Sequence, residues 1–113
     1  GLSELHIVDT MHVRKQMMTD RSDAFLILPG GYGTLEEAFE ILTWRQLGLH
    51  QKPIIFLNIH NFWNPLKELK QHLFEEAFIK ADDLQLFGIV DSTDGILPEI
   101  QAQMAALSLS EVS

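Results

Sequence analysis

A glycine-rich turn followed by two carboxylates is the part of this sequence whose residue types best suit chemistry. It covers residues 29–37 and reads PGGYGTLEE. Where such a turn opens a helix, backbone amides face a ligand and the helix dipole adds partial positive charge, which suits a phosphate. Thr34 adds a hydroxyl at the expected start of the helix. The segment predicts a phosphate-binding turn, and a tight strand–helix turn without a ligand is the alternative.

The turn matches neither of the two best-known phosphate motifs. The dinucleotide fingerprint G-x-G-x-x-G would need a third glycine where Glu36 stands, and no Gly-Lys-Ser/Thr follows, as a P-loop requires. Three glycines directly after an apolar, strand-like run nevertheless favour a ligand over an empty turn.

Glu37 is the carboxylate best placed to react. It follows Thr34 by three residues, so the two side chains share a helix face close to the glycine turn. A carboxylate there can act as a general base or stabilise a developing cation. Glu36 and Glu40 are more simply explained as acidic residues that stabilise the start of a helix dipole.

Arg14 and Lys15 are the cations most able to join this turn. They lie one turn into an expected helix over residues 10–21, which also begins at the carboxyl edge of the sheet. If the preceding strand neighbours the strand before the turn, Arg14 can offer its planar fork to a phosphate or a sugar hydroxyl. A solvated basic pair is the alternative.

Metal chemistry is not predicted, because no histidine pair has the spacing of metal ligands on a helix. The histidines are His6, His12, His50, His60 and His72. His60 belongs to an expected carboxyl-edge loop with Phe62 and Trp63, whose rings could stack on a base. Core packing is the alternative for at least one of the two rings.

Four strand-then-helix units position these residues. Strands are expected over residues 4–9, 24–28, 53–58 and 86–90, and helices over 10–21, 34–47, 62–80 and 93–107, the third with an interruption near Phe74. Gly48 is expected to terminate the second helix. This alternation predicts one α/β domain over residues 1–113, with a parallel sheet, flanking helices and right-handed crossovers. Ligands bind such sheets at the carboxyl ends of the strands, where the glycine turn lies.

Composition narrows the class of partner. The 113 residues are 46% hydrophobic, enough for a core, and no apolar run is long enough to span a bilayer. The net charge of −8 argues against a nucleic-acid partner, which needs a basic face. The absence of cysteine excludes disulfides and fits a cytoplasmic location. No signal peptide is visible, and a first residue other than Met leaves open a tag remnant or a piece of a longer protein.

Two motifs taken together resemble the LOG ("lonely guy") family of cytokinin-activating nucleoside-monophosphate phosphoribohydrolases. They are MHxRK over residues 11–15 and PGGxGTxxE over residues 29–37. The resemblance runs along nearly the whole chain and includes TWxQLG over residues 43–48 and the pair Lys52-Pro53. Members have often been labelled lysine decarboxylases, although nothing in this sequence resembles a site for pyridoxal phosphate.

The resemblance implies a Rossmann-like fold, a dimer, and hydrolysis of the N-glycosidic bond of an N6-modified adenosine monophosphate without a metal or redox cofactor. By motif position, Arg14 and Glu37 would be the catalytic pair. Substrate binding would fall to the turn and two further residues: Gly30, Gly31, Tyr32, Gly33, Thr34, Leu35 and Glu36, with Lys15 and Thr43.

Full members of the family begin with a further strand and a further glycine-rich turn, which would precede Leu2 here. Two alternatives to the phosphoribohydrolase therefore stay open. One is a nucleotide-binding module without turnover, and the other is a nucleosidase for ordinary purine monophosphates.

Thr43 and Glu37 are six residues apart and should point to different sides of one helix. If both contact substrate, one of them serves the site of a second subunit. The sequence thus favours a homodimer with shared sites, packed in part through a helix face of Thr43, Trp44 and Leu47.

Overall fold

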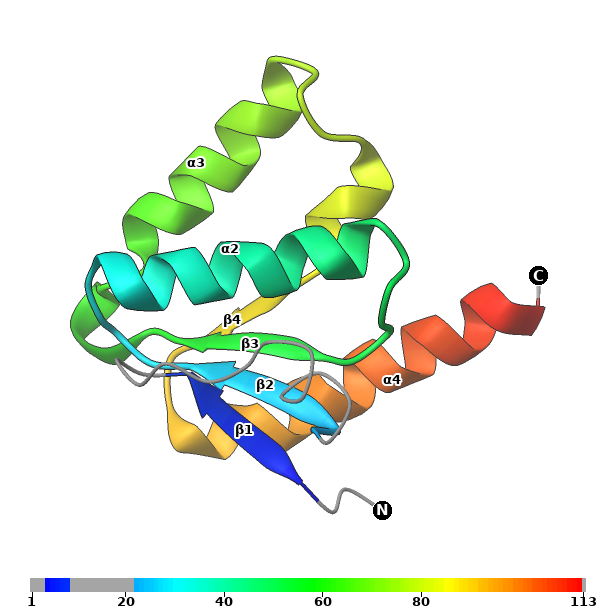
Figure 1. The fold of residues 1–113 in the computed structure, drawn as a ribbon, viewed down its shortest axis with the longest axis horizontal. Helices are drawn as coiled ribbons and strands as arrows, with labels where there is room; N and C mark the ends of the chain where they lie inside the picture. Colours follow the sequence, from blue (N-terminus) through cyan, green and yellow to red (C-terminus); the bar gives the residue numbers. More distant parts are fainter. Residues whose placement is uncertain (1–3, 9–21, 113) are drawn as a thin grey trace.

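The computed structural model of the chain describes residues 4–8 and 22–112, which form a parallel sheet flanked by helices (Figure 1). The strands are β1 (Leu5–Val8), β2 (Ala24–Ile27), β3 (Ile54–Leu57) and β4 (Gly88–Val90), and they follow one another in chain order across the sheet. Every neighbouring pair is parallel, with Val8 opposite Ile27 and Leu57 opposite Val90. The predicted α/β class and all four strands are confirmed, each strand being shorter than expected.

The central strands are buried on both faces, as their continuous apolar sequences AFLI and IIFL require. Alternate side chains point to opposite faces of a strand, so the core divides into two layers. Phe25, Ile27 and Phe56 belong to one layer, together with Ala38 and Ile41 from the second helix. The other layer contains four strand residues and one residue of the last helix: Ala24, Leu26, Ile55, Leu57 and Ile100.

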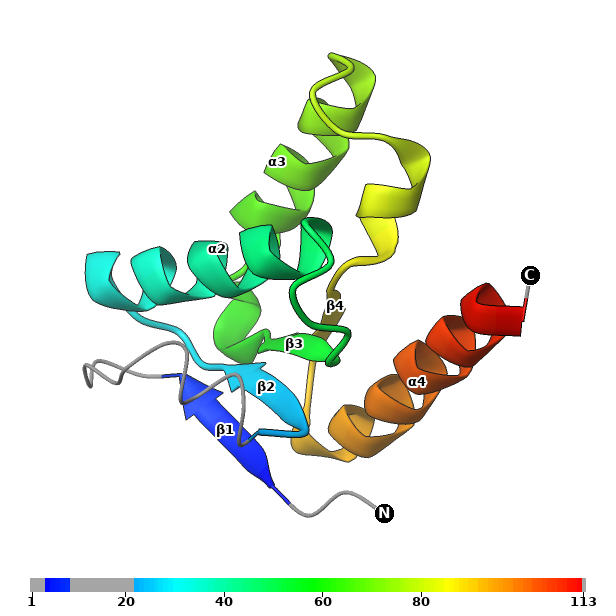
Figure 2. The same ribbon diagram turned by 45° about the vertical axis from the view of Figure 1, so that its right-hand side comes forward.

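In the described ranges, three α-helices cover these layers. They are α2 (Tyr32–Gln46), α3 (Asn64–Glu75) and α4 (Ile96–Val112). Figures 1 and 2 show α2 and α3 on one face of the sheet and α4 on the other. Short 3₁₀ turns, η1 (Ile59–Asn61), η2 (Ala81–Gln85) and η3 (Thr93–Gly95), precede α3, β4 and α4. The predicted helix over residues 10–21 lies outside the described residues.

The second helix ends as the sequence predicts. Gly48 adopts a left-handed φ of 80° directly after the helix. Its amide donates to the Arg45 carbonyl at 3.1 Å, and the Leu49 amide donates to the Trp44 carbonyl at 2.8 Å. This pair of bonds is the Schellman arrangement, in which glycine avoids the strain that a Cβ would suffer.

The helical stretch predicted over residues 62–80, with an interruption near Phe74, is confirmed up to that point: α3 ends at Glu75, and no helix continues over residues 76–80. Ala77 adopts a left-handed φ of 64°, and the Phe78 amide donates to the Leu73 carbonyl at 2.8 Å. This is again a Schellman end, formed here without the glycine that would have signalled it. The start of α2 was misplaced: Gly31 is the N-cap, so the helix begins at Tyr32 and not at Thr34.

Candidate active site

The glycine turn joins the carboxyl end of β2 to α2, and its three glycines have different roles. A Cβ on Gly30 would lie 2.8 Å from the Cβ of Thr34 and closer still to its hydroxyl, so packing against Thr34 requires glycine there. A Cβ on Gly31 or Gly33 would meet no atom of the described residues within 4 Å. Internal packing therefore explains Gly30, while Gly31 and Gly33 leave open space in front of the backbone, as a cradle for a ligand needs.

The first turn of α2 faces solvent. Gly31 and Gly33 are exposed, and Tyr32 is 92% exposed. No side chain caps the helix through Gly31. The amides of a first helical turn have no acceptor within their own helix, so the amides of Tyr32 and Gly33 lie where an anion can accept from them.

Thr34 and Leu35 point inward. Thr34 has no exposed surface and packs against Gly30, so it holds the turn in shape. Leu35 packs against the core layer under α2. The prediction that both bind substrate remains a prediction; what the structure gives each of them is a packing role.

Glu37 is a buried carboxylate directly behind the turn. It is 3% exposed, and its Oε2 atom is sealed from solvent, whereas the neighbouring Glu36 is exposed. Because α2 begins at Tyr32, both residues lie in the second turn, where the interaction with the helix dipole has weakened. Burying a carboxylate is costly, so dipole stabilisation alone does not explain Glu37, and its catalytic role stays a prediction.

Thr43 lies away from this turn. Its hydroxyl is exposed on α2 and donates to the Phe39 carbonyl at 2.8 Å. It lines an apolar groove of about 210 Å³ between α2, α3 and η2, which also contains Leu69 and Leu73. The structure therefore separates Thr43 from Glu37, as their six-residue spacing predicted.

Arg14 and Lys15 lie outside the described residues, so their assignment stays a prediction. The condition attached to Arg14 is met, since β1 and β2 are parallel neighbours along their whole length.

Asn58 is a central residue of the carboxyl edge that the sequence analysis missed. Its buried side chain accepts from the Trp63 amide at 2.6 Å and donates to Asn64 at 2.8 Å and to Asp91 at 3.4 Å. These bonds tie together the ends of β3 and β4 and the start of α3. A polar residue that directly ends a buried apolar run was the available signal.

The loop that Asn58 closes contains two left-handed residues, His60 with a φ of 53° and Asn61 with a φ of 59°. The two aromatic residues after them differ. Trp63 is buried and packs edge-on against Phe56, with ring centroids 4.9 Å apart. Phe62 is 45% exposed, so only this ring is accessible to a base.

Other kinds of site are not found in the described part of the chain. Within residues 4–8 and 22–112, no group of three or more histidine or acidic side chains could hold a metal ion. None of the described helices has both the length and the apolar character needed to cross a membrane.

A parallel sheet with an open glycine turn at a helix N-terminus and a buried carboxylate behind it defines a Rossmann-like domain with a candidate phosphate site. Residues 1–100 match the family described as "Possible lysine decarboxylase", and the chain belongs to this family. The resemblance to LOG proteins is thereby confirmed.

The names of the similar curated proteins give an activity other than decarboxylation. A cytokinin riboside 5'-monophosphate phosphoribohydrolase of Rhodococcoides fascians is 52% identical over 79 residues, which are 70% of this chain and 40% of that protein. A probable enzyme of the same name from Oryza sativa subsp. japonica is 49% identical over 86 residues, 76% of this chain and 39% of its own length. One from Arabidopsis thaliana is 46% identical over 85 residues, 75% of this chain and 40% of its own. The matched part of the chain spans about two fifths of these relatives.

Proposed function

We propose that this chain provides the phosphate-binding and catalytic corner of a phosphoribohydrolase. The substrate would be a nucleoside 5'-monophosphate, with an N6-modified adenosine monophosphate preferred, and the products the free base and ribose 5-phosphate. The observation that carries the proposal is the buried Glu37 carboxylate behind the open Gly31–Gly33 turn. The names of the relatives support the same reaction.

The reaction replaces the bond between the base and C1′ of the ribose by a bond to water. Positive charge builds on the ribose as the base leaves, and the buried Glu37 carboxylate stabilises that charge and orients the attacking water. Glu37 takes one proton from the attacking water, and that proton is passed on to the departing nitrogen of the base, so the reaction consumes one water and leaves Glu37 ionised again. Arg14 positions the sugar or the water.

The turn contributes binding energy far from the reacting carbon. The amides of Tyr32 and Gly33 hold the 5′-phosphate, which has no part in the bond change. This fixes the ribose against Glu37, so binding energy from the phosphate lowers the barrier at C1′.

Decarboxylation, the reaction in the family's description, is not supported by this site. Enzymatic decarboxylation of an amino acid commonly uses pyridoxal phosphate, and nothing in the sequence resembles a site for it. No step of the proposal uses such a cofactor.

One assay tests the function. The protein is incubated with AMP and with isopentenyl-AMP, and ribose 5-phosphate and free base are measured. Glu37→Gln keeps the size of the side chain and removes its charge, so we expect turnover to fall by about 100-fold or more. Glu36→Gln should lose less, and Glu68→Gln, on the exposed side of α3, should retain full activity.

The same assay decides between the alternatives. Binding of either nucleotide without release supports a binding module, and release from AMP alone supports a general purine nucleosidase. Turnover that survives both Arg14→Ala and Glu37→Ala contradicts the site assignment.

A homodimer is part of the proposal. The apolar groove beside Thr43 and the exposed side chains of Phe39 and Leu47 on the same helix suit packing against a second copy. Thr43 would then reach the partner's site. The proposal also locates the protein in the cytoplasm, which the absence of cysteine fits.

A further inference from the structure

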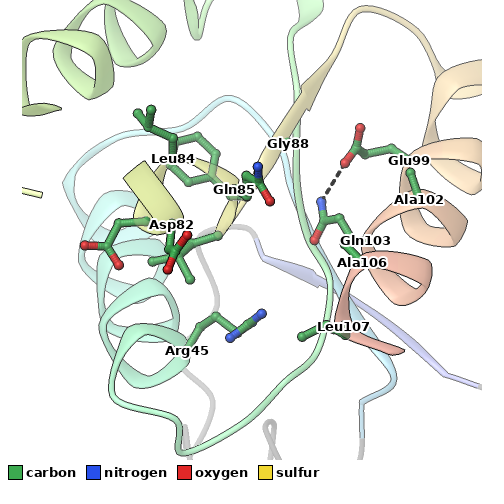
Figure 3. Close-up of a pocket in the computed structure, with 13 residues that line it drawn as sticks. Arg45, Asp82, Leu84, Gln85, Gly88, Glu99, Ala102, Gln103, Ala106 and Leu107 are labelled. Carbon is green, nitrogen blue, oxygen red and sulfur yellow. Dashed lines mark hydrogen bonds between the residues drawn. The ribbon is translucent and has the colours of Figure 1, made fainter. Parts of the chain in front are cut away.

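A larger cavity lies at the opposite edge of the sheet from the glycine turn. It has a volume of about 750 Å³ and is enclosed by the end of α2, η2, the start of β4 and α4 (Figure 3). Gly88, the first residue of β4, lines it, whereas the glycine turn lies at the carboxyl end of β2. This amino-edge cavity has no part in the proposed reaction.

Of the described residues that line this cavity, Arg45 alone is a cation. Figure 3 shows its side chain extending from α2 into the space between α2 and α4. Burial lowers the pKa of this half-buried guanidinium, and no counter-charge within the described residues offsets the effect. A cation suits the last turn of a helix, but that preference does not require it to enter a cavity without an anion.

Two of the three carboxylates in the lining are already occupied. The Oδ2 atom of Asp83 accepts from the side-chain amide of Gln46 at 3.2 Å and from the backbone amide of Lys80 at 3.0 Å. Glu99 accepts from Gln103 at 2.9 Å, the bond drawn in Figure 3. Among the described residues, none of the three carboxylates, Asp82 included, forms an ion pair with Arg45, so the guanidinium fork is left for an external acceptor.

The charge balance limits the kind of anion. Arg45 contributes +1, and Asp82, Asp83 and Glu99 contribute −3, so the lining has a net charge of −2. A phosphate or a polycarboxylate would meet repulsion from several sides, while a single carboxylate pairs with the arginine and adds only one charge.

The remaining wall of the cavity is apolar, and hydrogen bonds fix α4, which forms part of it, against β3. Leu86, Phe87 and Leu107 line the cavity beside Arg45. Gln103 exchanges two hydrogen bonds of 3.0 Å with the backbone of Ile54, which fixes α4 against β3. The site is therefore preformed and offers a charged end and an apolar end.

We propose that the amino-edge cavity binds a small monocarboxylate with an apolar body, its carboxylate held by the guanidinium of Arg45 and its body against Leu86, Phe87 and Leu107. The inference is independent of the proposed reaction, since it concerns the other edge of the sheet.

The test uses four probes and the isotope-labelled protein. Hexanoate is compared by NMR titration with its neutral isostere hexanamide, with hexylammonium and with inorganic phosphate. We expect saturable shifts from hexanoate at the Gly88 and Leu107 amides and the Gln103 side chain, with Gly31 and Gly33 unaffected. Hexanamide should bind at least about tenfold more weakly, since it lacks the charge-assisted pair.

Variants identify the contact. Arg45→Gln should weaken hexanoate binding by about tenfold, Arg45→Lys by less, and Lys67→Gln, an exposed charge-matched control on α3, should change nothing. Ala106→Phe, which fills the cavity, should abolish binding if Arg45→Gln fails to fold. Equal affinity for hexanamide, tighter binding of hexylammonium or phosphate, or no saturable shift at these positions overturns the proposal.

Discussion

At the scale of single residues, neighbours of the same type differ because their surroundings differ. Glu36 and Glu37 are adjacent carboxylates, but one is exposed and the other buried behind the glycine turn. Gly30 and Gly33 belong to one motif, but a side chain would be blocked at the first and free at the second. Burial and open space therefore indicate which members of the motif act on a ligand.

The two glycines give opposite predictions. Gly30→Ala forces its methyl group against Thr34, and we expect a loss of about 1–3 kcal/mol in the free energy of unfolding. Gly33→Ala meets no atom and lies in a helix, so we expect a gain of about 0.5–1 kcal/mol together with weaker AMP binding. Urea denaturation and calorimetric titration measure the two effects. Unchanged AMP affinity in Gly33→Ala would contradict the cradle.

His50 makes stability depend on pH. Its Nδ1 accepts from the Lys52 amide at 3.1 Å, so Nε2 carries the proton and donates to the Ile41 carbonyl at 2.9 Å. Burial is the largest cause that lowers the pKa of His50 below its usual 6.5. The unfolded chain therefore binds more protons, and the free energy of unfolding should fall as the pH drops below about 6.5.

Urea denaturation across this pH range measures the effect. His50→Gln should remove most of the slope that this histidine contributes. Equal slopes in the wild type and in His50→Gln would rule out this role.

At the scale of elements, α2 and α3 end in the same way with different residues. Gly48 ends α2 at a φ of 80°, and Ala77 ends α3 at a φ of 64°. The geometry of the end is shared, because in both helices the second residue past the cap donates back to the last turn. Only the alanine bears the strain of a left-handed conformation.

Ala77→Gly should therefore stabilise the protein. Removing the Cβ relieves the left-handed strain, and we expect about 1 kcal/mol in the free energy of unfolding and a higher Tm. Ala102→Gly, in the middle of α4, is the matched control and should destabilise by a similar amount. A lower Tm for Ala77→Gly would contradict the observed end of α3.

At the scale of the whole molecule, the two candidate sites lie at opposite ends of the strands. The glycine turn and Glu37 lie at the carboxyl edge, and Arg45 lies in the cavity at the amino edge. Thr43 lines the apolar groove between α2, α3 and η2, whereas Glu37 is buried behind the glycine turn. A substrate that contacts both Glu37 and Thr43 would need two copies of the chain.

Mixed dimers test this arrangement. A dimer of one Arg14→Ala subunit and one Thr43→Ala subunit retains one intact site if the two residues act on opposite subunits' substrates. Activity should then recover to at most half of the wild-type value, although each variant alone is inactive. If no pairing restores turnover, the shared site is rejected.

The sequence by itself determined the class of fold and the location of the reactive segment. Four apolar runs alternating with helical stretches are a local signal, and they predicted the parallel sheet and the turn at its carboxyl edge. The break near Phe74 was expected, but the left-handed Ala77 that closes α3 was not, since an alanine in that conformation leaves no mark in the sequence.

Only the tertiary structure decided what each side chain of the motif faces. Glu37 is buried while Glu36 is exposed, and Thr34 packs on Gly30. Asn58 ties three segments together. These arrangements depend on the packing of the folded chain and cannot be read from the spacing of the motif. The same is true of Arg45, whose cavity is built from four separate elements. Spacing along a helix shows which side chains share a face, but packing against the rest of the molecule decides whether that face meets solvent, core or ligand.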